Sequence, residues 1–277
     1  MAATQKPAPK KKSTGFQGIR NAFWIIVAMF IVAVCIFKFV LGNPANFVGG
    51  DPEGAVLNGN MLGTIYKGGI VVPVLITLLL TVLCLSIERF LAQRTAFGKM
   101  STTKFVTQIK AALAANDFAK AEELCTKQRG TIANVVGASL KAYKEMEATE
   151  GIKKAQKIAK IQQAHEEAVQ IEMPTLQMNM PILATLVTLG TLTALFGTVT
   201  GMIKSFAALA SGGGGDSVAL STGISEALIN TALGILTSWC AVISYNTFSN
   251  RIDKLTYALD EVGYTIAQTY EANHEEA

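Results

Sequence analysis

Four long apolar segments constrain the fold of this chain more than any other feature. Residues 21–42, 68–87, 180–206 and 219–248 are all predominantly apolar. Each reaches the roughly 20 residues that a helix needs to cross about 30 Å of hydrocarbon. The whole chain is 50% hydrophobic and only 16% charged, which is lean in charge for a soluble protein. The sequence therefore predicts an all-α membrane protein with four transmembrane helices.

The distribution of Lys and Arg predicts how these helices are oriented. Basic residues gather in the arm 1–20, which precedes the first span, and in the long segment 88–179. The segment 43–67 contains only Lys67, and 207–218 contains no Lys or Arg. Because positive charge favours the cytoplasmic side, both termini and the long segment are expected in the cytoplasm. The first span is longer than the apolar part of a signal peptide and lacks a clear cleavage site, so we expect it to remain as an anchor.

The long cytoplasmic segment reads as helix throughout. Amphipathic helices are expected over 102–115 and 117–127, with Asp117 capping the second and Gly130 ending it. A third is expected to begin near Ile132. Residues 151–173 carry apolar residues at three-to-four spacing and predict a stalk helix with a buried stripe, where Pro174 and Pro181 suggest a kink or a restart. A coiled coil with a purely structural role is equally compatible with this stretch.

The fourth apolar segment contains one carboxylate, Glu226, followed by an uncharged run from Ala227 to Asn250. An ionisable group at mid-membrane depth costs roughly 2.5 kcal/mol or more on insertion scales, so such a residue usually faces a bundle interior or a water-filled path. Glu226 is therefore a candidate proton or ion site. The alternative is a protonated carboxyl group, or one that joins neighbouring helices by hydrogen bonds.

Polar and small residues form lines along the last two spans. At 100° per residue, one line contains Thr191, Thr198 and Ser205, and another contains Glu226, Asn230, Thr237 and Ser244. Thr231, Gly234 and Ser238 form a neighbouring face of small residues. Such faces often pack helices closely together. A carboxylate and an amide on the same line favour a polar lumen instead, with Thr191, Ser205, Thr237 and Ser244 as pore-lining candidates.

Several other functions are disfavoured by the sequence. His165 and His274 stand in charged surroundings and are expected to be solvated, and the four cysteines lack the spacing of metal ligands. We expect no metal, no cofactor and no disulfide framework. No nucleophile–base pair indicates an enzyme, and no aromatic–basic pattern indicates nucleic-acid binding. Gly212 to Gly215 lack the Lys-Ser/Thr of a phosphate-binding loop and are expected to form a flexible turn.

Two motifs carry a specific resemblance. Leu-Phe-Gly-Thr-Val-Thr-Gly-Met-Ile-Lys-Ser-Phe at 195–206 and Gly-Ile-Ser-Glu-Ala-Leu-Ile-Asn-Thr-Ala-Leu-Gly-Ile at 223–235 resemble the two signature helices of the MotA/TolQ/ExbB proton channel family. The Glu-Arg-Phe at 88–90 and the cytoplasmic Ala-Glu-Glu-Leu-Cys also fit this family, and the ExbB branch is the most similar. The resemblance covers roughly residues 65–250.

This resemblance implies a homopentameric proton-channel stator of the bacterial inner membrane. Its last two helices, extended and pore-lining, would surround the single span of an ExbD-like partner and pass work to a TonB-like protein. Glu226, Thr198 and Thr231 match the family's proton path, and Asn230 lies beside them on the fourth helix. The layout predicted from apolarity and charge is a basic cytoplasmic arm (1–20), spans at 21–42, 68–87, 180–206 and 219–248, periplasmic loops at 43–67 and 207–218, a cytoplasmic helical domain (88–179) and a cytoplasmic tail (249–277).

The chain departs from the family pattern in ways that leave alternatives open. Its four spans resemble the layout of MotA, because ExbB and TolQ proteins usually have three. Gly190-Thr191 replaces an Ala-Pro pair, and Lys204 near the outer end of the third helix is expected to snorkel to the interface. TolQ-like envelope maintenance, MotA-like motility and a non-conducting membrane scaffold remain the alternatives, and the coupling ion could be a proton or sodium.

Overall fold

The computed structural model describes residues 22–52, 54–211 and 217–274, which form two compact units. Of the described residues, the membrane unit comprises those of 22–89 and 178–250, and the polar unit comprises those of 90–177 and 251–274. The basic arm 1–20 and the glycine turn at 212–215 lie outside the described residues. Within the described part, four helices are long and apolar enough to cross a membrane, as predicted.

The membrane unit begins with α1 (Ala22–Cys35), which continues as a π-helical stretch, η1 (Ile36–Leu41). Trp24 and Phe30 are exposed on α1, as expected for a helix that faces lipid. Two short 3₁₀ turns, η2 (Pro44–Asn46) and η3 (Val48–Gly50), and the short helix α2 (Met61–Tyr66) follow. The remaining helices of this unit are α3 (Val71–Phe97), α8 (Met180–Ser211) and α9 (Ser217–Asn273), of which α3 and α9 continue into the polar unit.

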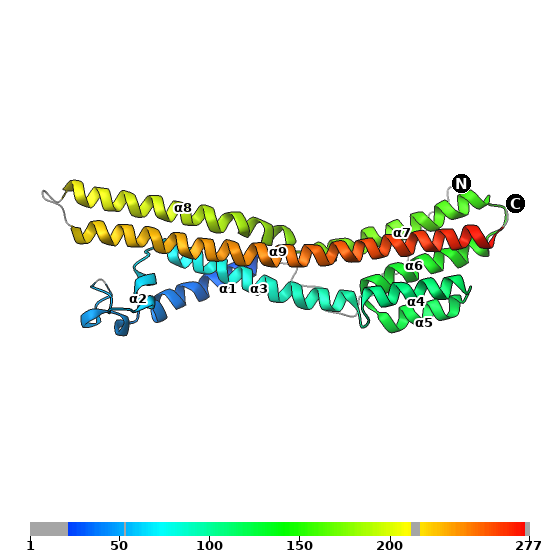
Figure 1. Cartoon of the computed structure of the whole chain (residues 1–277), viewed down its shortest axis with the longest axis horizontal. Helices are drawn as coiled ribbons and strands as arrows, with labels where there is room; N and C mark the ends of the chain where they lie inside the picture. Colours follow the sequence, from blue (N-terminus) through cyan, green and yellow to red (C-terminus); the bar gives the residue numbers. More distant parts are fainter. Residues whose placement is uncertain (1–21, 53, 212–216, 275–277) are drawn as a thin grey trace. The chain divides into compact units, whose positions relative to one another are not determined.

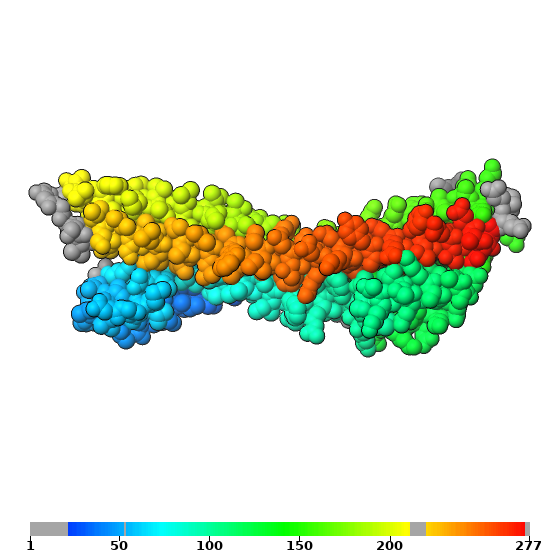
Figure 2. Space-filling view, in the orientation of Figure 1, coloured from blue at the N-terminus to red at the C-terminus, as the bar shows by residue number. Residues whose placement is uncertain are grey.

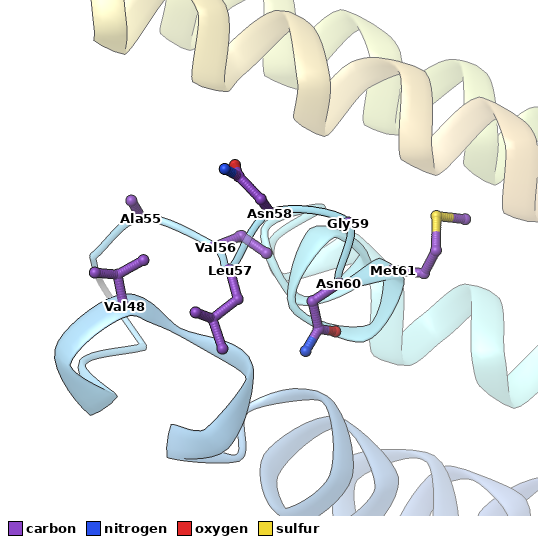
Figure 3. Close-up of a pocket in the computed structure, with 8 residues that line it drawn as sticks. All are labelled: Val48, Ala55, Val56, Leu57, Asn58, Gly59, Asn60 and Met61. Atoms are coloured by element: carbon purple, nitrogen blue, oxygen red, sulfur yellow. The ribbon is translucent and has the colours of Figure 1, made fainter.

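The buried Asn46 side chain organises the loop between the first two spans. Its Nδ2 donates to the Val40 and Leu41 carbonyls at 2.8 and 2.9 Å, and its Oδ1 accepts from Asn60 Nδ2 at 3.0 Å. An open hollow of about 900 Å³ lies beside this loop, lined by Val48 and residues 55–61 (Figure 3). Asn58 and Asn60 point in opposite directions there (Figure 3), so the hollow gathers no convergent polar groups.

The polar unit is a bundle of α4 (Thr102–Ala114), α5 (Phe118–Gln128), α6 (Gly130–Glu147) and α7 (Lys154–Gln177) with the last part of α9 (Figure 1). Asp117 caps α5 as predicted, because its Oδ1 accepts from the Lys120 backbone N–H at 2.9 Å. Gly130, at φ +82°, both follows α5 and opens α6. The core is apolar and aromatic; its fully buried side chains include Phe105, Ile109, Leu113, Ile132, Leu140, Tyr143, Ile161 and Tyr270.

The chain restarts between the stalk helix and the third span. Pro174 lies inside α7, which continues to Gln177. Asn179 then adopts a left-handed conformation, with φ +62°, and α8 begins at Met180 with Pro181 in its first turn. A restart is one of the two outcomes that the prolines suggested, since proline fits the first turn of a helix, where its missing N–H leaves no bond unmade.

The expectation that both histidines are solvated was wrong. His165 is only 8% exposed and its Nδ1 lies 2.8 Å from Ser139 Oγ, because its face of α7 packs against α6 and α9. Gly263 on α9 makes room for the ring, since a Cβ there would lie 2.4 Å from His165 Nε2. His274 is partly covered and its ring stacks on Tyr270, with centroids 4.2 Å apart. The charged neighbours in the sequence concealed that the buried face of α7 passes through His165.

Acidification is expected to destabilise the polar unit through His165. Burial lowers the pKa of His165 below its ordinary value of 6.5, although Asp260 and Glu166 oppose this shift. The folded state therefore favours neutral imidazole, whose contribution is complete above the pKa of the unfolded chain and is lost as pH falls through the lower folded-state pKa. Thermal midpoints of the full chain, measured from about pH 7 to pH 5, should fall less for His165→Gln than for wild type. Equal acid sensitivity of the two would contradict this, and His274→Gln is the matched control.

Candidate functional site

The two signature helices lie side by side as an antiparallel hairpin in the membrane unit (Figure 1). Thr198 Oγ1 on α8 and Thr231 Oγ1 on α9 are 2.5 Å apart and share a hydrogen bond. Each hydroxyl also lies within reach of a carbonyl one turn earlier on its own helix, Ala194 for Thr198 and Ala227 for Thr231, at 3.0 and 3.1 Å. The structure thus brings together two residues that the resemblance assigned to one path.

Small residues allow α8 and α9 to approach this closely. A Cβ added at Gly234 would lie 2.2 Å from Ala194 Cβ, and one at Gly223 would lie 2.1 Å from Ser205 Oγ. Ser238 Oγ donates to the Val187 carbonyl of α8 at 2.7 Å. The face formed by Thr231, Gly234 and Ser238 is therefore a packing surface between the two helices of one chain, which is how small residues act in many membrane proteins.

Glu226 is buried on α9 and forms an ion pair with Lys204 of α8. Lys204 Nζ lies 2.8 Å from Glu226 Oε1, and the side chains of the two residues are 57% and 8% exposed. The expectation that Lys204 snorkels to the interface did not include this contact with Glu226. In an antiparallel hairpin, a residue late in α8 lies level with one early in α9, and this places the ammonium group beside the carboxylate.

A third element, the turn that precedes α3, completes the site. Asn230 Nδ2 donates to the Gly68 carbonyl at 3.1 Å. The Glu226 carboxylate packs on Gly69, where an added Cβ would lie 2.3 Å from Oε1. Gly69 has φ +77°, which L side chains rarely adopt, so glycine is favoured there on both counts. Sequence reasoning missed this contribution, although the Gly68-Gly69 pair directly before an apolar run was a visible signal.

The other predicted residues fall mainly on contacts within the chain. Thr237 is buried and donates to the Leu233 carbonyl, and Ser205 is buried and donates to the Gly201 carbonyl. Ser244 Oγ lies 2.8 Å from Ser86 Oγ of α3. Thr191 is exposed and donates to the Thr188 carbonyl. A pore-lining role for these four residues stays a prediction. Thr191 is the most exposed of the four, so its side chain is accessible to another subunit.

A buried ion pair at the end of the second span was also missed as a structural site. Arg89 Nε donates to Glu88 Oε2 at 2.6 Å, and a second bond joins Arg89 to the other carboxylate oxygen. Arg89 is fully buried and Glu88 is 4% exposed. Asn179 Nδ2, just before α8, donates to Glu88 Oε2 at 3.3 Å. These contacts connect α3 to the start of α8 and so help to position the first signature helix.

Residues 22–52, 54–211 and 217–274 hold no group of three or more His, Cys, Asp or Glu residues arranged to bind a metal ion. The charged groups of the candidate site are one carboxylate and one ammonium group, and its other polar groups are hydroxyls, an amide and backbone carbonyls.

The part of the chain that contains α8 and the membrane part of α9 resembles a known protein family. Residues 130–261 match the model of the MotA/TolQ/ExbB proton channel family. The chain is 30% identical over 141 residues to a Tol-Pal system protein TolQ from Pseudomonas aeruginosa, and 35% identical over 88 residues to one from Haemophilus influenzae. It is 35% identical over 80 residues to a biopolymer transport protein ExbB from Salmonella typhimurium. These matches cover 51%, 32% and 29% of the chain, and 59%, 39% and 33% of the relatives. Residues 130–261, which contain both signature helices, are thus similar to the MotA/TolQ/ExbB proton channel family.

Proposed function

We propose that this chain is a proton-channel stator subunit of the bacterial inner membrane, in which Glu226 carries the ion. The observation that carries the proposal is the burial of Glu226 on α9, where α9 meets α8 through the Thr198–Thr231 hydroxyl pair. A carboxylate can gain and lose a proton, whereas hydroxyl and amide groups orient water and partners. Thr198, Thr231 and Asn230 serve in this second capacity.

The proposed orientation follows from charge. Both termini and the polar unit lie in the cytoplasm, because basic residues are concentrated there, and the loop 43–67 lies in the periplasm. Glu226 lies nine residues after Ser217, where α9 begins, and it therefore sits toward the periplasmic side of the fourth span.

The proposed output is TonB-dependent transport across the outer membrane, with an ExbD-like single-span partner inside the ring. The match to a biopolymer transport protein ExbB supports this output. A Tol-type output is the second candidate, because the alignment to TolQ of Pseudomonas aeruginosa covers 141 residues against 80 for ExbB. A MotA-like motor and a non-conducting scaffold are the further alternatives. A neighbouring gene for a single-span protein with an intramembrane Asp would favour a stator over the scaffold.

The purified protein is expected to form a closed homopentamer with α8 and α9 innermost. Apolar side chains such as Phe196, Ile203, Leu228 and Trp239 are 62–66% exposed on these helices, whose surfaces appear in yellow to orange in Figure 2. An apolar hollow of about 610 Å³ between them is lined by Val187, Ile235, Trp239 and their neighbours. Native mass spectrometry from mild detergent should report five copies. A monomer would contradict the proposed ring.

The ring alone is expected to conduct protons poorly, because a relay needs more than one titrating station. The signature spans 180–206 and 219–248 supply a single carboxylate per subunit, Glu226. The measurement is proton uptake into liposomes under an imposed pH gradient, with and without the ExbD-like partner. We expect flux only with the partner, and its loss in Glu226→Gln. Rapid, Glu226-dependent flux from the ring alone would show that the partner is dispensable for conduction.

A further inference from the structure

Lys204 is the only basic residue in the two signature spans 180–206 and 219–248. Its Nζ lies 2.8 Å from Glu226 Oε1. The carboxylate end of this pair is 8% exposed, whereas the lysine side chain is 57% exposed, so the ammonium group reaches the carboxylate from the open side. An ammonium group donates three hydrogen bonds and accepts none, and it fills the position that any other cation would need beside Oε1.

The next turn of α9 and the turn at Gly68-Gly69 bring further oxygen atoms into the neighbourhood of this carboxylate. Asn230 is fully buried one turn after Glu226, and its Oδ1 has no hydrogen-bond partner among the described residues. The amide nitrogen of the same side chain holds the Gly68 carbonyl, next to Gly69, against which the Glu226 carboxylate packs. Carboxylate, amide and backbone carbonyl oxygens are the ligands that hard metal cations prefer. Without Lys204, these oxygens would resemble a site for a small metal cation.

We infer that Lys204 determines the ion specificity of this site by excluding sodium in favour of protons. A proton bonds to a single carboxylate oxygen and needs no further ligands. Sodium needs several oxygens at once, and to reach Glu226 it must displace an ammonium group whose charge then stays nearby and repels it. This inference rests on the proposed role of Glu226 as the ion carrier, and it assigns the choice of ion to a residue outside that carrier.

The test measures sodium binding directly on the purified full-length protein in detergent. Thermal midpoints are compared in sodium chloride and in choline chloride at equal ionic strength, for wild type, Lys204→Met and Lys204→Arg. Wild type and Lys204→Arg, which both keep a cation beside Glu226, should show equal midpoints in the two salts. Lys204→Met should be stabilised by sodium by roughly 3–6 °C when sodium is in about tenfold excess over its dissociation constant. Adding Glu226→Gln to Lys204→Met should remove that response.

A matched control comes from a second ion pair, Lys110–Glu261, which lies exposed in the polar unit. Lys110→Met should show no sodium response, because exposed oxygens there remain hydrated. A sodium-specific shift in wild type that Glu226→Gln abolishes would overturn the inference, and so would the absence of any sodium response in a folded Lys204→Met. If Lys204→Met does not fold, Lys204→Gln provides the same comparison. A separate experiment tests the proposed role of Glu226 as the ion carrier. Normal energy coupling in cells that carry Glu226→Ala would contradict that role.

Discussion

Replacing Glu226 by alanine is expected to reduce energy coupling to the level of a strain that lacks the protein. The substitution removes the single carboxylate of the signature spans but little packing volume, so the ring should still assemble. The readouts are growth under iron or vitamin limitation, for a TonB-type output, and proton flux in liposomes that contain the partner. Growth of the variant at the wild-type rate, with wild-type flux, would refute the carrier role.

The structure calls for two controls in that experiment. Glu226→Ala leaves the Lys204 ammonium without its carboxylate, so a loss of coupling could follow from that unpaired charge. Glu226→Gln retains an acceptor for Lys204 but cannot release a proton, and it should be equally inactive. Thr198→Ala should be milder, because its hydroxyl orients a hydrogen bond to Thr231 and does not titrate near neutral pH.

Replacing Arg89 by methionine is expected to destabilise the protein by about 3–5 kcal/mol, because it leaves the buried Glu88 carboxylate without its bidentate cation. The double variant Glu88→Met/Arg89→Met should recover most of that loss, since replacing a whole buried pair by apolar side chains of similar volume is often close to neutral. Thermal midpoints in detergent measure both effects. The single variant should melt at least roughly 6 °C below wild type.

An exposed ion pair supplies the control for Arg89. Lys127 and Glu123 are paired on the surface of α5, where both side chains are more than 60% exposed. Lys127→Met should change stability by less than about 0.5 kcal/mol, because solvent screens exposed pairs. An equal loss in Lys127→Met and Arg89→Met would show that burial of the Glu88–Arg89 pair contributes nothing.

Local patterns predicted most of the helices, because each depends on neighbours in the sequence. The apolar spans follow from a length and composition that any window of about 20 residues reveals. The cap at Asp117 and the restart near Pro181 follow from backbone rules for single residues. The identity of Glu226, Thr198 and Thr231 as candidate site residues was likewise available from two short motifs.

Contacts between distant segments could not be predicted in the same way. Helical periodicity places Glu226, Asn230, Thr237 and Ser244 on one side of α9, but it does not say which surface that side meets. In the folded chain, Asn230 bonds to the turn before α3 and Ser244 to α3 itself. A polar stripe on a helix can line a water-filled lumen or can pack against another helix of the same chain. The sequence of the stripe alone does not distinguish these two outcomes.

His165 and Lys204 also have contacts that local sequence patterns did not predict. His165 was expected to be solvated because charge surrounds it in the sequence, and Lys204 was expected to snorkel to the interface because it lies near the end of a span. His165 is instead covered by α9, which is about a hundred residues away in the sequence, and Lys204 is paired across the hairpin with Glu226.

The sequence by itself determined the helices, their membrane character and the carboxylate at the centre of the site. Only the tertiary structure decided which cation, which amide and which glycine turn surround that carboxylate, because those contacts depend on helix register and on the faces that helices present to one another.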